Sequence, residues 1–263
     1  MLFAAVGFSE AVCRGLKETI FQQEDHETIM NVSSQRVLVF DLNGTLLDLS
    51  ALDGRFEHIF GTRGARELWF KELTTLVLTS VITGRYLDFP TQANAALTVL
   101  AESDRVELPT GSRAAILESL QALPAFSDVI PALTRLRDAG ARLAVLTNGT
   151  LQSARMQLEF AGLSELFHQV LSADEVQRMK PAPEPYRMAA ERFACQPEDL
   201  FMVAAHPWDL AGASAVGLGT AFLARPRQAL SPSGPRPDFV ASDLEALAEL
   251  LLREPALHEA GKA

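Results

Sequence analysis

Short runs of apolar and β-branched residues alternate along most of the chain with segments in which apolar residues recur every three to four positions. Runs of the first kind predict buried strands, and segments of the second kind predict helices that pack on them. The expected strands are Val37–Phe40, Arg142–Leu146, His168–Leu171, Leu200–Val203 and Thr220–Leu223. Because strands and helices alternate, the pattern predicts an α/β fold with a Rossmann-like parallel sheet and helices on both faces.

One stretch, residues 51–122, breaks this alternation and is helical throughout. Leu68, Trp69, Leu73, Leu76 and Val77 recur at helix spacing, and a second helical run covers residues 93–100. The stretch lies between the first and second predicted strands, so it predicts an inserted all-helical cap over the carboxyl ends of the strands. We therefore expect a catalytic core made of residues 35–50 and 123–263.

Helix-stop and loop signals elsewhere in the chain agree with this division. A helix expected at Ile130–Ala139 ends at Gly140, a common stop signal, and a Pro/Gly/Ser-rich loop at Arg225–Pro237 precedes a closing helix at Leu244–Leu252. Residues 1–34 lack a basic start and a long apolar run, so we interpret them as a poorly ordered N-terminal extension and expect no membrane span.

Charge and cysteine content narrow the partners. With 23 Lys and Arg against 33 Asp and Glu, the net charge is −10, which disfavours nucleic acid and anionic membranes as partners. A small anionic substrate would need local positive groups. Cys13 and Cys195 have neither zinc-site nor redox-pair spacing, so we expect free thiols in a reducing cytoplasm.

The first predicted strand runs directly into Asp41-Leu42-Asn43-Gly44-Thr45. A carboxylate at the carboxyl end of a parallel strand faces the edge where ligands bind in open α/β sheets. The Gly-Thr turn beside it offers backbone N–H groups to an anion. Asp41 is thus a candidate nucleophile, although an aspartate that only caps a turn would look the same.

Three more strand ends carry polar side chains: Thr147-Asn148-Gly149, Lys180-Pro181 and His206-Pro207-Trp208-Asp209. Each has an ordinary structural explanation, such as a turn, a surface lysine or a helix N-cap. A hydroxyl, an ammonium and a carboxylate at successive strand ends are harder to explain separately. Together they predict one site around Asp41.

With these motifs the chain resembles the haloacid dehalogenase superfamily, and within it the L-2-haloacid dehalogenases (type II), over residues 36–253. The Asp-x-x-Gly-Thr turn, the Thr-Asn-Gly turn and the Lys-Pro pair are typical of the superfamily. The narrower group is indicated by Trp208-Asp209, Tyr186, and in the cap Leu68-Trp69, Arg85-Tyr86 and Phe89.

The resemblance implies a mechanism without a metal. Asp41 would attack the halogen-bearing carbon, and water would then hydrolyse the ester. By resemblance, Thr45 supports the nucleophile and Thr147 with Asn148 binds the substrate carboxylate. Lys180 would keep Asp41 ionised, because a cation within about 4–6 Å lowers a carboxylate pKa. Second-line positions that support the lysine and the hydrolytic water are matched by Tyr186 and Asp209; further candidates for substrate contact are Leu42, Asn43, Phe70, His206 and Trp208.

Four positions depart from the pattern of that group. Phe70 stands where the group has a halide-binding arginine, and Lys71 next to it points about 100° away on a helix. Asn43 replaces an aromatic residue, Ala204 a serine and His206 an asparagine. His206 could act as a general base or hold a structural hydrogen bond; Arg85 is another candidate cation.

These departures leave three hypotheses. The first is a metal-independent hydrolase that converts a short 2-haloalkanoic acid to the 2-hydroxy acid through an aspartyl ester. The second is a Mg²⁺-dependent phosphatase or phosphonate hydrolase, disfavoured because Asn43 is not the acid such enzymes need and Asp209 stands alone after its strand. The third is a non-catalytic binding member. Apolar residues from Leu76 to Ile82 also predict a homodimer surface.

Overall fold

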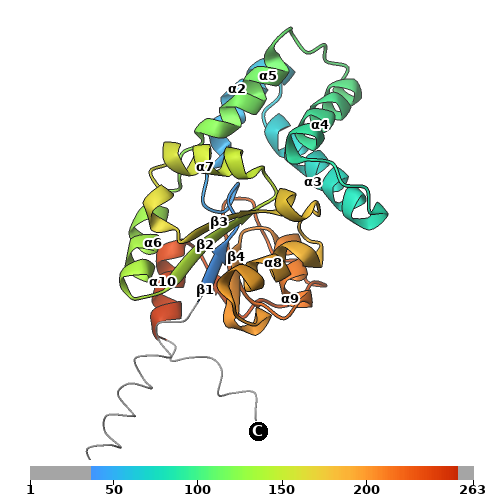
Figure 1. Ribbon diagram of the computed structural model, residues 1–263. Coiled ribbons are helices and arrows are strands. Elements are labelled where there is room, and N and C mark those ends of the chain that lie inside the picture. The colour runs from blue at the N-terminus through green and yellow to red at the C-terminus, as the bar shows by residue number, and fades with distance from the viewer. Residues whose placement is uncertain (1–36, 254–263) are drawn as a thin grey trace, which may run out of the picture.

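A six-stranded parallel sheet forms the centre of the molecule (Figure 1). The structure, a computed structural model, describes residues 37–253, so the expected extension 1–34 and Cys13 lie outside the described residues. The strand order is β3-β2-β1-β4-β5-β6. The strands are β1 (Val37–Phe40), β2 (Arg142–Thr147), β3 (Gln169–Ser172), β4 (Leu200–Ala204), β5 (Gly219–Leu223) and β6 (Phe239–Ala241).

Helices cover both faces of the sheet because alternate strand residues point to opposite sides and both sets are apolar. On one face Leu38, Leu143 and Val203 belong to the same core as α6 (Val129–Asp138), α7 (Leu151–Phe160) and α10 (Leu244–Arg253). On the other face Val39 and Met202 pack with α8 (Pro183–Phe193) and α9 (Pro207–Ala215). Such double burial is typical of parallel sheets and leaves the strand ends as the place for a site.

A separate group of helices follows β1 and stands above the sheet in Figure 1. It contains α2 (Asp53–Phe60), α3 (Ala65–Thr83), α4 (Phe89–Asp104) and α5 (Ser112–Ser119). Trp69 of α3 is fully buried, and its indole Nε1 donates to the carbonyl oxygen of Ala93 in α4 at 3.0 Å. The predicted fold class, a Rossmann-like core with an inserted helical cap, is confirmed. The proposed boundary residues of the two parts stay a prediction.

Several element ends differ from the predicted ones. The strands β2 and β4 each extend one residue further, β3 begins after His168, and the helix expected at Ile130–Ala139 spans Val129–Asp138. β6 was not predicted as a strand, because it has three residues and Val240 is 53% exposed, so no apolar run marks it. Single helical turns lie at Leu49–Leu52, Leu120–Ala122, Ser164–Leu166, Ala173–Val176 and Pro197–Asp199. Within residues 37–253 the helices are all too short or too polar to span a bilayer.

Candidate active site

Asp41 lies immediately after β1, the strand at the middle of the sheet, and is 5% exposed. The chain turns sharply behind it at Gly44, whose φ of +81° is a conformation that favours glycine. A Cβ at Gly44 would also lie 3.1 Å from the imidazole of His206. The turn brings Thr45 back, and its hydroxyl donates to Oδ2 of Asp41 at 2.6 Å.

Lys180 is fully buried and joins Asp41 to Asp209. Its Nζ donates to Oδ1 of Asp41 at 2.9 Å, to Oδ2 of Asp209 at 2.7 Å and to the carbonyl oxygen of Leu146 at 2.7 Å. The other Asp209 oxygen, Oδ1, accepts from the hydroxyl of Tyr186 at 2.6 Å. All three donors of the ammonium are therefore used, as a buried charge requires.

The charges of this group are mutually dependent. Burial raises the pKa of Asp41, but the Lys180 ammonium, His206 and the Thr45 hydroxyl together hold that pKa below its ordinary value. Burial also raises the pKa of Asp209, which stays above its ordinary value because Asp41 adds to the effect of burial against Lys180. The pKa values of the two carboxylates are thus shifted in opposite directions, and the lower one belongs to Asp41.

The turn after β2 is tied to Lys180 from the other side. Asn148 accepts from the backbone N–H of Lys180 at 2.7 Å and donates to its carbonyl oxygen at 3.1 Å. The hydroxyl oxygen of Thr147 accepts from the backbone N–H of Gly149 at 3.0 Å. These bonds fix a small turn whose two side chains face the same cavity as Asp41.

His206 is held rigidly between two aromatic rings. It stacks on Trp208 with 5.5 Å between ring centroids and 7° between planes, and lies 5.3 Å from Phe70 of α3. Its Nε2 is 3.0 Å from the carbonyl oxygen of Asn43 and 3.6 Å from Oδ2 of Asp41. Since a carbonyl oxygen can only accept, Nε2 carries a proton, which argues against this nitrogen as a general base.

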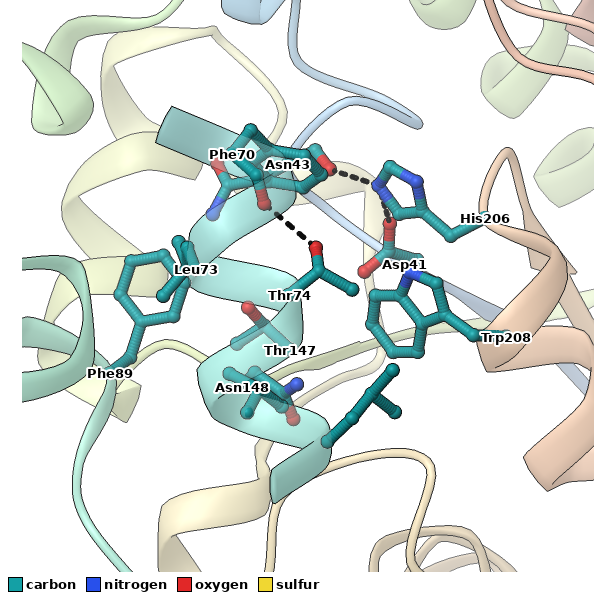
Figure 2. A pocket seen from close by; sticks show the side chains of 12 residues that line it. Asp41, Asn43, Phe70, Leu73, Thr74, Phe89, Thr147, Asn148, His206 and Trp208 are labelled. Carbon is teal, nitrogen blue, oxygen red and sulfur yellow. Dashed lines mark hydrogen bonds and ion pairs between the residues drawn. The ribbon is translucent and has the colours of Figure 1, made fainter. Parts of the chain in front are cut away.

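A cavity of about 40 Å³ opens between the strand ends and the cap helices (Figure 2). Its polar wall contains six of the predicted residues, namely Asp41, Asn43, Thr147, Asn148, His206 and Trp208, and Phe70 closes one side. The volume admits a few water-sized groups, and hence a small molecule. A wider hollow of about 430 Å³ adjoins it and shares Phe70, Thr74, His206 and Trp208.

Other predicted residues lie behind this wall. Thr45, Lys180, Asp209 and Tyr186 are buried and reach the cavity only through their bonds to Asp41 or to one another. Leu42 is fully buried in the apolar core and is not part of the wall. Similarly, Arg85 is exposed and lines neither hollow, so it does not replace the missing arginine.

The cap supplies wall residues that sequence reasoning did not assign to the site: Leu73, Thr74, Val77, Leu78 and Phe89. Most lie on α3 at helix spacing, and this spacing was the signal in the sequence that could have identified them as wall residues. Apolar residues occur on several sides of this helix, so the spacing alone did not identify the face that covers Asp41.

No group of three or more His, Cys, Asp or Glu within residues 37–253 is arranged to hold a metal ion. The two carboxylates of the site, Asp41 and Asp209, are bridged by the Lys180 ammonium. A divalent cation between them would meet that positive charge. The donor set therefore fits a lysine-centred site better than a Mg²⁺ site.

Comparison with known proteins gives consistent matches. The family of haloacid dehalogenase-like hydrolases matches residues 35–217. Two (S)-2-haloacid dehalogenases of Pseudomonas sp. (strain CBS-3) are 31% and 30% identical to this chain, covering 83% and 82% of it and 97% and 95% of their own lengths. The crystal structure of an L-2-haloacid dehalogenase, 28% identical, superposes with a TM-score of 0.79 over 83% of this chain and 99% of that one.

Proposed function

Because this chain belongs to the haloacid dehalogenase-like hydrolases, we propose that it removes the halogen of a short 2-haloalkanoic acid through an ester on Asp41. The observation that carries the proposal is the contact of 2.9 Å between Asp41 and the buried Lys180 ammonium. A carboxylate is a weak nucleophile and must be ionised, desolvated and aimed. Burial raises the pKa of Asp41, but the Lys180 ammonium helps to hold it below its ordinary value, which meets the first need.

In the first step an Asp41 oxygen attacks C2 of the substrate, and the carbon–halogen bond breaks with its electron pair leaving on the halide. The Thr147–Asn148 turn, which faces the same cavity, is placed to bind the substrate carboxylate. Lys180 and the Thr45 hydroxyl each hold one oxygen of the nucleophile in place. Both contacts fix the direction of attack, which is the main requirement for a displacement.

In the second step water adds to the carboxyl carbon of the ester, and the bond to the product oxygen breaks. The 2-hydroxy acid takes up one proton, and Asp41 is regenerated with an oxygen from water. Asp209, whose two carboxylate oxygens accept from Lys180 and Tyr186, is assigned the role of holding the lysine against Asp41, and the second proton of the water passes to solvent. His206 is assigned a binding role, because its Nε2–H already faces Asn43.

The alternatives have less support. A phosphatase or phosphonate hydrolase with Mg²⁺ would need an acid at Asn43 and more carboxylates than Asp41 and Asp209 provide. A non-catalytic binding protein would have no use for a buried lysine that holds a carboxylate ionised beside a cavity. We therefore propose catalysis without a metal cofactor.

Single-turnover hydrolysis of 2-chloropropionate in ¹⁸O-labelled water tests the ester. With enzyme in excess, one oxygen of Asp41 becomes labelled and the first product carries unlabelled oxygen at C2, because water attacks the ester and not the substrate. Mass spectrometry of the peptide that contains Asp41 measures this. Label in the product alone would exclude the ester.

A substrate panel separates the competing functions. Halide release from 2-chloropropionate or fluoroacetate in the presence of a chelator supports the proposal. Phosphate release from p-nitrophenyl phosphate that depends on Mg²⁺ would contradict it. No turnover of any of these compounds, with no thermal stabilisation by small carboxylates, would favour the binding protein.

The proposal also includes the domain boundaries, the oligomeric state, the cellular location and the partners. We assign residues 51–122 to a cap and 35–50 with 123–263 to the core, and we expect a homodimer that uses the cap surface. The free thiol of Cys195 suits a reducing cytoplasm. The proposed partner is a small anionic substrate, and neither nucleic acid nor a membrane is part of the proposal.

A further inference from the structure

Gln157, on α7, is a buried polar residue that lies beside the site but has no part in the mechanism above. Its side chain is 2% exposed. Its amide nitrogen Nε2 donates to Oδ1 of Asn43 at 2.9 Å and to the carbonyl oxygen of Leu120 at 2.7 Å. A helix on one face of the sheet thereby contacts a residue of the turn that carries Asp41.

The chemistry of these two bonds fixes which way the Asn43 amide points. The carbonyl oxygen of Leu120 can only accept, so the Gln157 atom facing it must be the nitrogen. That nitrogen is a donor, so the Asn43 atom facing it must be the oxygen. The other polar atom of the amide, the Nδ2 donor, remains for the cavity that Asn43 lines.

Other donors in the cavity wall are already engaged. The hydroxyl of Thr74 donates to the carbonyl oxygen of Phe70 at 2.8 Å, and Nε2 of His206 faces the carbonyl oxygen of Asn43. The rest of the wall contributed by the cap is apolar, with Leu73, Val77, Leu78 and Phe89. Among the side chains of the wall outside the Thr147–Asn148 turn, Asn43 Nδ2 and the indole of Trp208 are the donors to which no acceptor within residues 37–253 is assigned.

The direction of the reaction distinguishes these two donors. A displacement at carbon needs the attacking oxygen and the leaving group on opposite sides of the carbon. Figure 2 shows Trp208 on the same side of the site as Asp41 and His206, whereas the side chain of Asn43 extends beside Phe70, away from His206. In this view the amide of Asn43 lies across the site from Asp41, which is the side to which we assign the leaving group.

We propose that Nδ2 of Asn43 is the hydrogen-bond donor that receives the departing halide, and that Gln157 is the positioning residue that turns this donor towards the cavity. The inference rests on the proposed dehalogenase function. It assigns leaving-group binding to the neutral amide of Asn43, because the neighbouring wall residue Phe70 offers no hydrogen-bond donor. An anion accepts hydrogen bonds strongly, so the contact strengthens as the carbon–halogen bond breaks.

Replacing Gln157 with methionine tests the positioning role, because methionine has a similar length but offers no N–H. We expect kcat/KM for 2-chloropropionate to fall about tenfold, since the amide loses its fixed orientation. The fall for 2-bromopropionate should be smaller, because bromide leaves more readily and needs less assistance. The ratio of the two kcat/KM values, measured by halide release, should therefore rise several-fold.

Gln92 provides a matched control. It is also a buried glutamine, 2% exposed, and its Nε2 donates to Ser80 and to the carbonyl oxygen of Leu87 within the cap. Gln92→Met removes a comparable set of bonds without touching Asn43. Its thermal unfolding midpoint should fall by a similar amount, and its bromide-to-chloride ratio should equal that of the wild type.

A second variant tests the donor itself. Asn43→Leu keeps the backbone carbonyl that faces His206 and removes the amide, so it should raise the same ratio and lower kcat/KM for 2-chloropropionate about a hundredfold. Equal losses for both halides in Gln157→Met and Asn43→Leu would overturn the inference and leave the dehalogenase function intact. Absence of halide release from either substrate by the wild type would overturn both.

Discussion

At the scale of single residues, Phe70 is the most informative side chain of the site. It lines the inner cavity and the wider hollow, and its ring lies 5.3 Å from that of His206. A neutral ring at this position leaves the stabilisation of a departing anion to neutral donors such as the Asn43 amide. A charged donor would add Coulomb attraction to the departing anion, which a neutral amide lacks. The identity of residue 70 should therefore control the rate of halide departure.

Phe70→Arg should raise kcat/KM for 2-chloropropionate about tenfold, because a guanidinium would face the leaving group across the cavity. The adjoining hollow of about 430 Å³ offers room for the longer side chain. Phe70→Leu is the control, since it changes the size of the side chain without adding charge. Steady-state halide release measures both. A fall in the arginine variant would mean that the leaving group is received elsewhere in the cavity.

The polar part of the site could be predicted from the sequence, and the apolar part could not. Asp41, Lys180 and Asp209 follow strands, and strand ends of a parallel sheet meet at one edge whatever the details of packing. Gln157 lies in the middle of a helix, where a buried glutamine has no local signature. Its contact with Asn43 depends on how α7 packs, which the linear pattern does not contain.

At the scale of secondary structure, apolar runs predicted β1, β2, β4 and β5, which are mostly buried on both faces, and also the edge strand β3, whose last two residues are buried. The other edge strand, β6, was missed because it has three residues and only the last of them is buried. A different problem arises in α3, where apolar residues occur on several sides: Trp69 faces the cap interior, Leu73 the cavity and Ile82 the outside. Periodicity predicts such a helix but not which neighbour each side contacts.

One contact ties the helical cap to the core directly below it. The hydroxyl of Tyr86, between α3 and α4, donates to the carboxylate of Asp174, in the short helix after β3. Burial, followed by this carboxylate, raises the pKa of Tyr86 far above its ordinary value. The contact lies three residues before Phe89, a wall residue of the cavity, so it couples the cap to the shape of the site.

Tyr86→Phe should raise KM for 2-chloropropionate about threefold and change kcat little, because the wall at Phe89 loses its anchor while Asp41 and Lys180 are untouched. The cost to stability should be about 1 kcal/mol, that of one hydrogen bond at a partly exposed site. Asp174→Asn and the double variant complete a thermodynamic cycle measured by urea unfolding and steady-state kinetics. Additive effects of the two changes would show that the hydroxyl and the carboxylate are not coupled.

At the scale of the whole molecule, an anionic substrate approaches a protein of net charge −10. Long-range attraction is therefore absent, and the entrance must supply its own positive charge. Three cations, Arg66, Lys71 and Arg227, line the wider hollow outside the inner cavity together with one carboxylate, Glu67, which pairs with both arginines. Lys71 is exposed. This local positive charge lies next to the cavity. Near the entrance it offsets the repulsion between an anionic substrate and the rest of the negatively charged surface.

The outer surface of the cap also bears on the size of the functional particle. Ile82 is 83% exposed and Leu68 is 49% exposed, and both lie on α3. Within the stretch from Leu76 to Ile82, suggested by the sequence as a homodimer surface, Ile82 is the exposed apolar residue, because Val77 is buried and Leu78 lines the cavity. We propose that two copies pair through this face of α3, which would remove Ile82 and Leu68 from water. Light scattering should give twice the chain mass for the wild type and a shift towards the monomer for Ile82→Asp.

Ile130→Asp is the control: it changes an isoleucine that is 47% exposed on α6, in the core, and should leave the dimer intact. A monomeric wild type at micromolar concentration would refute this arrangement, and equal dissociation of both variants would place the contact elsewhere.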